Sequence, residues 1–310
     1  RFSLHPSQII PVYLMKGMSI ILAGVMLLVF ANHCQAQTAQ APQSTKSENT
    51  TPPLRIAVSA NFTPTLKNLL IVFTKETGIK VQIISASSGT LYLQIKHGAP
   101  FDVFLSADAE RPKKLQQAGL VVPNTRHTYA LGELALFTTK KAPLTVNNLK
   151  QWLSTQPQRF AIANPKLAPY GQAAKAVLIQ LSLWQSFKDH LVIGQNINQT
   201  FQQVRSHNVS GGIVAHSQLI ANGLSGELMP KNLYPAIEQQ MVILKSSKQQ
   251  NSSKKLQQFL LSPRIQKHIK TFGYGIEAEA RIKNKIKNDS DSLNKNKSAT
   301  PLKGSERERH

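Results

Sequence analysis

The stretch Ser85–Asp108 constrains the fold more than any other part of the chain. An apolar run at 81–84 leads into a small polar loop, Ser87–Thr90, which is followed by a helical pattern through 91–95. A second apolar run, Val103–Leu105, comes after the turn that ends this helix. The order strand, loop, helix, strand is typical of a parallel βαβ unit, so the sequence predicts an α/β fold.

The loop Ser87–Thr90 stands where the predicted helix begins. The first N–H groups of a helix lack partners within the helix, and the helix dipole makes this end positive. Hydroxyl side chains and Gly89, which lets the backbone approach a guest closely, favour an anion there. The alternative is a plain N-cap followed by a tight turn.

A second corner of the same kind precedes this one. Leu54–Val58 reads as a strand that ends at Ser59-Ala60-Asn61-Phe62, and a helix is predicted from Thr63 to Glu76, stopped by Gly78. In a parallel sheet these corners lie along one edge, where open α/β sheets bind ligands. Asn61 and Ser88 therefore come first as candidate binding residues.

The length and charge set outer limits. With 310 residues the chain can form one large core or two lobes of ordinary domain size. Residues 37–280 carry 26 basic and 11 acidic side chains, so the central part is basic, at +15, without the two ends. Such a surface attracts anions. The chain has no arginine-rich helix, zinc-finger spacing or aromatic RNA-binding signature, so we expect no nucleic-acid partner.

Several segments together resemble a known family. Val58–Thr63, Ala86–Leu91 and Gly98–Asp108, continuing through Glu110–Leu115, resemble the periplasmic molybdate-binding proteins of molybdate ABC transporters. The likeness covers roughly residues 54–278. It implies a type II periplasmic binding protein, which has two α/β lobes and holds an oxyanion in the cleft between them.

The second half of the chain adds two further corners. Phe160–Ala163 is a predicted strand, and Tyr170 lies between it and a helix predicted from Gln172 to about Leu181. A fourth corner lies at Ile197, before a helix predicted from Asn198 to about Arg205. None of the four loops has Lys or Arg at its tip, and Lys166 is the nearest charge. Neutral donors alone would then hold a dianion.

The resemblance assigns the ligand contacts to these corners. The residues that match the family's contacts are Ala60, Asn61, Ser88, Tyr170 and Ile197. Taken singly, Asn61 could be an N-cap and Tyr170 a packed, hydrogen-bonded surface residue. No cofactor and no directly bound metal ion are expected, since molybdenum would arrive as the oxyanion molybdate through these same residues.

The domain boundaries follow from the strands and the likeness. Gly132–Phe137 is read as a strand that passes from the first lobe to the second, and Met241–Leu244 as one that returns. The predicted parts are a signal peptide at 1–36, a linker at 37–53, lobe 1 at 54–133 plus 241–280, lobe 2 at 134–240 and a disordered basic tail at 281–310.

The N-terminal region predicts export. Lys16 precedes an uncharged apolar run, Ile20–Phe30, which is too short to span a membrane and suits a cleavable signal. Residues 1–14 precede Met15 and are open to being an untranslated extension. Cleavage after Ala36 is favoured over lipidation of Cys34, because no lipobox precedes that cysteine. The expected location is the periplasm.

The predicted function is a monomeric carrier that captures molybdate, and also tungstate, for an inner-membrane ABC permease. Sulfate, phosphate or another oxyanion is the alternative ligand. An enzyme is not expected, because no nucleophile or acid–base pair stands out, and Asp102 and Asp108 are read as residues that orient turns. A transcriptional regulator would need a DNA-binding helix-turn-helix, and the export signal argues against one.

Overall fold

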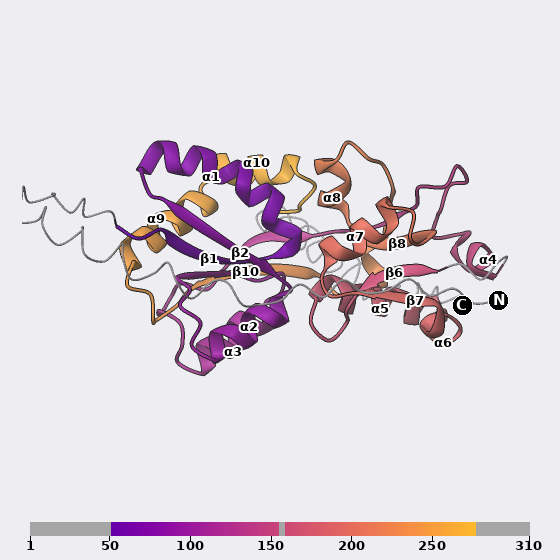
Figure 1. Ribbon diagram of the computed structural model, residues 1–310, viewed down its shortest axis with the longest axis horizontal. Helices are drawn as coiled ribbons and strands as arrows, with labels where there is room; N and C mark the ends of the chain where they lie inside the picture. The colour runs from indigo at the N-terminus through magenta and orange to yellow at the C-terminus, as the bar shows by residue number, and fades with distance from the viewer. Residues whose placement is uncertain (1–50, 155–158, 277–310) are drawn as a thin grey trace, which may run out of the picture. The chain divides into compact units, whose positions relative to one another are not determined.

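The computed structural model describes residues 51–154 and 159–276. The predicted signal peptide, the linker up to residue 50 and the basic tail lie outside these residues. The described chain forms two five-stranded sheets, each covered by helices on both faces (Figure 1). The predicted α/β class, with two lobes, is confirmed.

The first sheet has the strand order β2-β1-β3-β10-β4. Its strands are β1 (Leu54–Ser59), β2 (Val81–Ala86), β3 (Val103–Leu105), β4 (His127–Gly132) and β10 (Ile237–Ile243). Strands β1, β2 and β3 are parallel, whereas β10 runs antiparallel to both β3 and β4. Together with its helices, this sheet is called the first lobe below.

The helices of the first lobe surround that sheet. They are the short turn η1 (Ala60–Phe62), α1 (Thr63–Thr77), α2 (Ser88–Lys96), α3 (Glu110–Gln117), α9 (Gln250–Leu261) and α10 (Pro263–Thr271). Helix α1 buries Leu66, Leu69 and Phe73 at helical spacing against the sheet and ends at Gly78, whose φ of 69° closes the helix. Figure 1 shows α1 and α10 on one side of the sheet and α2 and α3 on the other.

The second lobe is built around the sheet β7-β6-β8-β5-β9. Its strands are β5 (Leu134–Phe137), β6 (Phe160–Ala163), β7 (Leu191–Gly194), β8 (Gly211–Ala215) and β9 (Glu227–Leu228). Its helices are α4 (Leu149–Ser154), α5 (Pro169–Gln180), α6 (Trp184–Phe187), η2 (Lys188–His190), α7 (Ile197–Arg205), α8 (His216–Ala221) and η3 (Lys231–Leu233).

The chain passes between the lobes twice. The first crossing is Glu133, the single residue between β4 and β5, where the sequence had predicted one continuous strand. The return is made ahead of β10, which begins at Ile237 rather than at the predicted Met241. Residues 237–240 pair with β4, so they belong to the first sheet. The sequence missed them because Glu238, Gln239 and Gln240 break the apolar run that was read as the strand.

The two lobes have separate cores that are in contact with each other. Buried side chains on the two faces of the first sheet form two hydrophobic clusters, and two more lie on the faces of the second. The largest second-lobe cluster also includes Ala60, Ala107 and Ile237 of the first lobe. The lobes are therefore in direct contact at the ends of β1 and β3 and at the start of β10.

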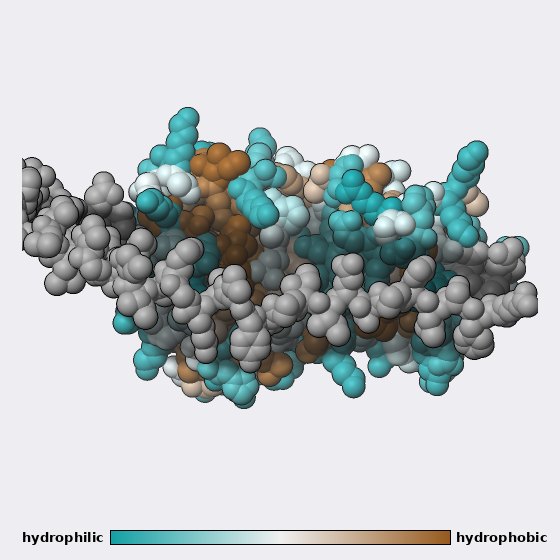
Figure 2. Space-filling view, viewed as in Figure 1, coloured by the Kyte–Doolittle hydropathy of each residue, from teal (hydrophilic) through white to brown (hydrophobic). Residues whose placement is uncertain are grey.

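On the face that Figure 2 displays, the most extended hydrophobic area lies beside α1, and smaller ones lie along the lower edge. A shallow groove beside α1 is lined by Leu70, Ile71, Val81 and Ile83, and Lys67 and Lys75 also border it. Within 51–154 and 159–276, no helix is both long and apolar enough to cross a membrane.

Candidate functional site

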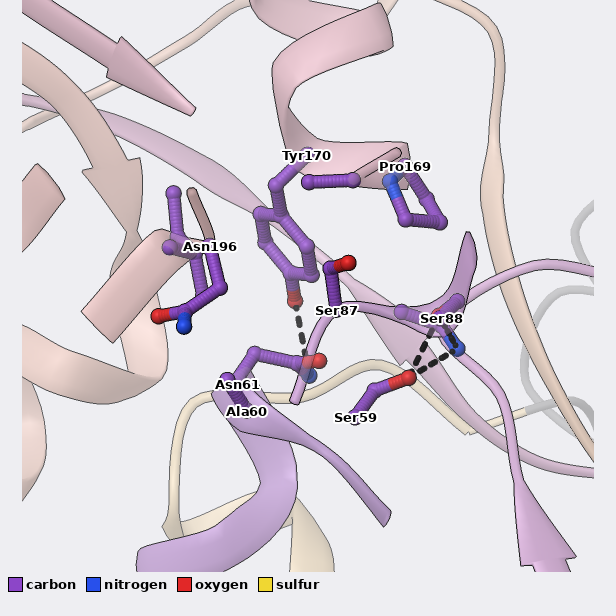
Figure 3. Close-up of a pocket in the computed structure, with 11 residues that line it drawn as sticks. Ser59, Ala60, Asn61, Ser87, Ser88, Pro169, Tyr170 and Asn196 are labelled. Carbon is purple, nitrogen blue, oxygen red and sulfur yellow. Dashed lines mark hydrogen bonds between the residues drawn. The ribbon is translucent and has the colours of Figure 1, made fainter. Parts of the chain in front are cut away.

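A small cavity lies where the two lobes touch (Figure 3). Residues from both lobes line it: Ser59, Ala60, Asn61, Ser87, Ser88, Ala107, Ala168, Pro169, Tyr170, Asn196 and Ile197. All five residues that the sequence predicted are in this set. The cavity measures about 10 Å³, and a buried water needs about 10–15 Å³ on the same scale, so the space in this structure is no larger than about one water.

Four helix starts converge on the cavity. The turn η1 leading into α1 and the helix α2 come from the first lobe, and α5 and α7 come from the second. Each lies at the carboxyl end of a strand, as the corners in the sequence predicted. Their positive ends therefore point toward one place, which favours a negatively charged guest.

Two serines of the first lobe form a bonded pair. Ser59 and Ser88 are almost fully buried, and their hydroxyls hydrogen-bond to each other (Figure 3). The backbone N–H of Ala107 donates to both, at 3.0 Å to Ser59 Oγ and 2.9 Å to Ser88 Oγ. One hydroxyl hydrogen is used within the pair, so one remains that can be donated to a guest.

Asn61 lies at the centre of a buried polar cluster. Its Nδ2 donates to Gln239 Oε1 at 2.8 Å and lies 3.4 Å from the hydroxyls of both Tyr170 and Tyr274. The hydroxyl of Tyr274 in turn donates to the backbone carbonyl of Asn61 at 2.9 Å. Figure 3 shows Asn61 and Tyr170 facing each other across the cavity. Asn61 is therefore a fixed donor and not the N-cap that was its alternative reading; no side chain caps η1 or α1.

Tyr170 lies in the first turn of α5, which begins at Pro169, three residues earlier than predicted. Proline suits this position because the first helical N–H needs no partner within the helix. Only 2% of Tyr170 is exposed, so the surface reading of this residue is wrong. A Cβ at Gly132, the last residue of β4, would lie 2.4 Å from the Tyr170 hydroxyl. Only glycine therefore leaves room for this hydroxyl.

The fourth corner is capped by its own asparagine. The side chain of Asn196 accepts hydrogen bonds from the N–H groups of Asn198, at 3.0 Å, and Gln199, at 3.1 Å. Ile197, the first residue of α7, also lines the cavity, and its side chain is apolar. This end of α7 thus contributes main-chain rather than side-chain polarity.

Two hydrogen bonds join the lobes beside the cavity. The N–H of Gly89 donates to the carbonyl of Leu167 at 2.8 Å, and the guanidinium of Arg111 donates to the carbonyl of Lys166 at 3.3 Å. Asp108 orients Arg111 through an ion pair. A Cβ on Gly89 would lie 2.8 Å from Leu167 O, so the close contact depends on glycine. The sequence named Lys166 as the nearest charge but did not identify Arg111.

Burial keeps the phenols of the cluster neutral. Removal from water raises the pKa of Tyr129 and of Tyr170 well above the ordinary value of 10, and raises the pKa of Tyr274 to about 12. All three remain protonated at physiological pH and keep a hydrogen to donate. No charged side chain lines the cavity among the described residues.

The sequence missed several residues that complete the site. Ser59 is the last residue of β1, in the same corner as Asn61, and Ala107 follows β3. The corner rule would have found Ala107 if it had also been applied after β3. Gln239 is fully buried and contacts Asn61, Tyr129 and Tyr170, but it lies mid-strand, and no motif marks it.

The two aspartates have the orienting roles that the sequence predicted. Asp102 accepts from the Arg55 N–H at 2.8 Å and from the Ser247 hydroxyl at 2.5 Å, whereas Asp108 accepts from the Arg111 N–H at 3.0 Å. Neither lines the cavity. Within the described ranges, no cluster of three or more His, Cys, Asp or Glu is placed to hold a metal ion.

Comparison with known proteins places these features in a family. The model of the bacterial extracellular solute-binding protein family matches residues 54–275. The molybdate-binding protein ModA of Rhodobacter capsulatus is 40% identical over 222 residues, which cover 71% of this chain and 87% of that protein. ModA of Azotobacter vinelandii is 40% identical over 229 residues, covering 72% and 90%.

A solved structure agrees with the curated relatives. The periplasmic molybdate-binding protein of Azotobacter vinelandii superposes with a TM-score of 0.67 at 36% identity, covering 72% of this chain and 99% of that one. The resemblance drawn from the sequence is confirmed. The chain belongs to the bacterial extracellular solute-binding protein family and, within it, to the relatives of the molybdate-binding protein ModA.

Proposed function

We propose that this protein captures molybdate, and also tungstate, as the substrate-binding component of an ABC transporter. The observation that carries the proposal is the convergence of four helix starts on a small buried cavity lined by neutral hydrogen-bond donors. The relatives named molybdate-binding proteins support the choice of ion.

The proposed ligand contacts are Ala60, Asn61, Ser88, Tyr170 and Ile197, joined by Ser59. An oxyanion with four oxygens needs more room than about 10 Å³, so the hydroxyls that now bond to each other would turn toward the ion. Asn196 already occupies the N–H groups of Asn198 and Gln199, which leaves the main chain at Ile197 for the ligand. The desolvated ion would exchange its water shell for these donors.

Neutral donors suit a carrier rather than an enzyme. A tetrahedral dianion accepts hydrogen bonds on every oxygen, and charged or polar groups that are already in place bind it without chemical change. Binding would close the two lobes through a hinge at Glu133, and opening would release the ion. The proposed partner is an inner-membrane permease, the proposed location is the periplasm, and the proposed assembly is a monomer.

Size would separate molybdate and tungstate from sulfate, because the four helix starts, once spaced for the larger ion, would leave longer hydrogen bonds to the smaller one. Phosphate would be disfavoured for another reason. At neutral pH it carries at least one hydrogen, which needs an acceptor, and the donor-lined cavity would leave that hydrogen unpaired.

Isothermal titration calorimetry of the purified protein with molybdate, tungstate, sulfate and phosphate tests the proposal. We expect one-to-one binding of the first two ions, with at least about a hundredfold weaker binding of the others. Tight binding of sulfate or phosphate would keep the oxyanion site and replace the ligand. No binding of any of the four would overturn the function.

A further inference from the structure

Gln239 lies directly behind the cavity and contacts two of its donors, although it does not line the cavity itself. It is fully buried in β10, which belongs to the first lobe. Its side-chain oxygen accepts from Asn61 Nδ2 at 2.8 Å, and its nitrogen donates to the Tyr170 hydroxyl at 3.3 Å. Gln239 therefore links a first-lobe donor to the one phenol of the second lobe that reaches the cavity.

The direction of these hydrogen bonds is set by a backbone carbonyl. Tyr274 gives its single hydrogen to the carbonyl of Asn61 at 2.9 Å, so toward the Asn61 side chain its oxygen can only accept. The atom of Asn61 at 3.4 Å from that oxygen must be the donor Nδ2. Because Nδ2 also donates to Gln239, the oxygen of Gln239 must face Asn61, and its NH₂ must face Tyr170.

The hydroxyl of Tyr170 then receives two donors. Gln239 Nε2 lies 3.3 Å from it and has a hydrogen to give. Asn61 Nδ2 lies 3.4 Å from it and can only share one of its two hydrogens, because these also serve Gln239 and Tyr274. The hydrogen of Tyr170 has no acceptor in either group, so it is directed elsewhere, and Tyr170 lines the cavity. A hydroxyl with this orientation donates to a guest that only accepts.

We propose that Gln239 is a positioning residue that sets the hydrogen-bond direction of Tyr170, so that the phenol donates into the cavity and favours a fully ionised oxyanion. The inference rests on the proposed oxyanion-binding function. It adds a residue outside the ligand contacts, and it explains why a neutral amide is buried at this point of the strand.

The variant Gln239→Glu tests the direction of these bonds. A protonated carboxyl group has one donor and one acceptor, like the amide, whereas an ionised one only accepts and would take the hydrogen of Tyr170. Burial raises the pKa of a carboxyl group, so this side chain should ionise between about pH 6 and pH 9. We expect near wild-type molybdate affinity at the acid end and at least about tenfold weaker binding at the alkaline end.

The buried phenols around Gln239 stay protonated across that range. Gln239 contacts Tyr129 from β4 and Tyr170 from α5, Tyr274 contacts its partner Asn61, and burial raises the pKa of all three phenols. The negative charge of Asp108 also raises the pKa of Tyr129, and that of Glu133 raises the pKa of Tyr170. The wild-type affinity should therefore stay constant across the same range.

Gln240→Glu is the matched control. It makes the same change one residue along β10, where the side chain contacts Arg126 and Thr128 and not the cavity cluster. Its molybdate affinity should be independent of pH. An affinity of Gln239→Glu that equals the wild type at every pH, or is reduced equally at every pH, would overturn the inference.

A second comparison does not depend on a buried carboxyl group. Gln239→Met is close in shape and makes no hydrogen bond, and its cost in molybdate affinity should shrink severalfold when Tyr170 is already Phe. Equal costs in both backgrounds would mean that Gln239 does not act through Tyr170. Absence of molybdate binding by the wild type would overturn the proposed function together with this inference, whereas pH-independent Gln239→Glu binding beside a competent wild type overturns the inference alone.

Discussion

The two lobes contribute to the cavity by different means. The first lobe supplies the side chains of Ser59, Asn61 and Ser88, which are bonded to partners within that lobe. The second lobe supplies one phenol, Tyr170, and the main chain around Ile197. This difference indicates that the donors of the first lobe are already positioned to bind the ion. The second lobe would add its donors when the lobes close.

The largest expected effect comes from reversing one donor of the first lobe. Asn61→Asp would put a carboxylate against the bound dianion, and like charges at about 4 Å repel by about 4 kcal/mol at an effective dielectric of about 20. We expect molybdate binding to weaken by about 10³-fold or more, as measured by calorimetry at pH 8.

Asn196→Asp makes the same change in the second lobe and tests whether the two lobes differ in their loss of molybdate affinity. Its side-chain oxygen accepts both hydrogen bonds that cap α7, so an aspartate keeps the cap and suits the helix dipole. Binding should weaken much less than in Asn61→Asp. Equal losses would mean that the lobes do not differ in the way that we describe.

Loss of a single hydroxyl should also differ between the lobes. Ser88→Ala removes a donor and disrupts the bonds to Ser59 and Ala107, so binding should weaken about 10- to 100-fold, since a hydrogen bond to a charged group contributes about 1.5–3 kcal/mol. Tyr170→Phe removes one bond and should cost about tenfold.

Tyr129→Phe is the control for the loss of a buried phenol. Tyr129 donates to the carbonyl of Ser106 at 3.1 Å, its hydroxyl also lies 3.2 Å from Gln239 Oε1, and it does not line the cavity. The melting temperature should fall, while the dissociation constant changes by less than about threefold. A Tyr170→Phe loss larger than that of Ser88→Ala would contradict the order proposed for the lobes.

Closure of the lobes can be weakened without touching the donors. Gly89→Ala places a Cβ 2.8 Å from Leu167 O, so the lobes must separate slightly or the 2.8 Å hydrogen bond must shift. We expect about tenfold weaker molybdate binding and a smaller ligand-induced compaction in small-angle X-ray scattering.

Arg111→Ala removes another hydrogen bond between the lobes, the one to the carbonyl of Lys166. This partly exposed arginine contributes no more than about 1 kcal/mol, so binding should weaken about fivefold at most. If Gly89→Ala compacts on binding as fully as the wild type, the close approach at Leu167 is not needed for closure.

The smallest effect concerns the crossing between the lobes. His216, which faces the carboxylate, and Lys231 at 2.6 Å hold the pKa of Glu133 at about 2, below its ordinary value of 4.5. A lowered folded-state pKa stabilises the protein above about pH 4.5, and this stabilisation is lost as the pH falls toward 2.

Glu133→Gln should therefore flatten the decline in melting temperature between about pH 4.5 and pH 2, without changing molybdate affinity at pH 7. Scanning calorimetry across this range measures the slope. An unchanged slope would show that the charge of Glu133 does not stabilise the crossing.

Much of the fold could be predicted because it depends on local patterns. The apolar spacing of α1 and its stop at Gly78 agree with the structure to within one residue. The start of α5 was placed late, because Tyr170 and Gly171 look like loop residues until the preceding Pro169 is recognised as the first helical position. Strand β10 was shortened because its polar residues are buried by partners in other segments.

The sequence alone determined that the chain alternates strands and helices and that small polar residues stand at the strand-to-helix corners, because these features follow from periodicity over a few residues. Only the tertiary structure decided which corners meet and in which direction their hydrogen bonds run. Asn61 and Gln239 are 178 residues apart, and Asn61 and Tyr274 are 213 apart, yet their contacts fix the donor that faces the cavity. Such pairings depend on how two sheets pack together, and no local pattern contains that information.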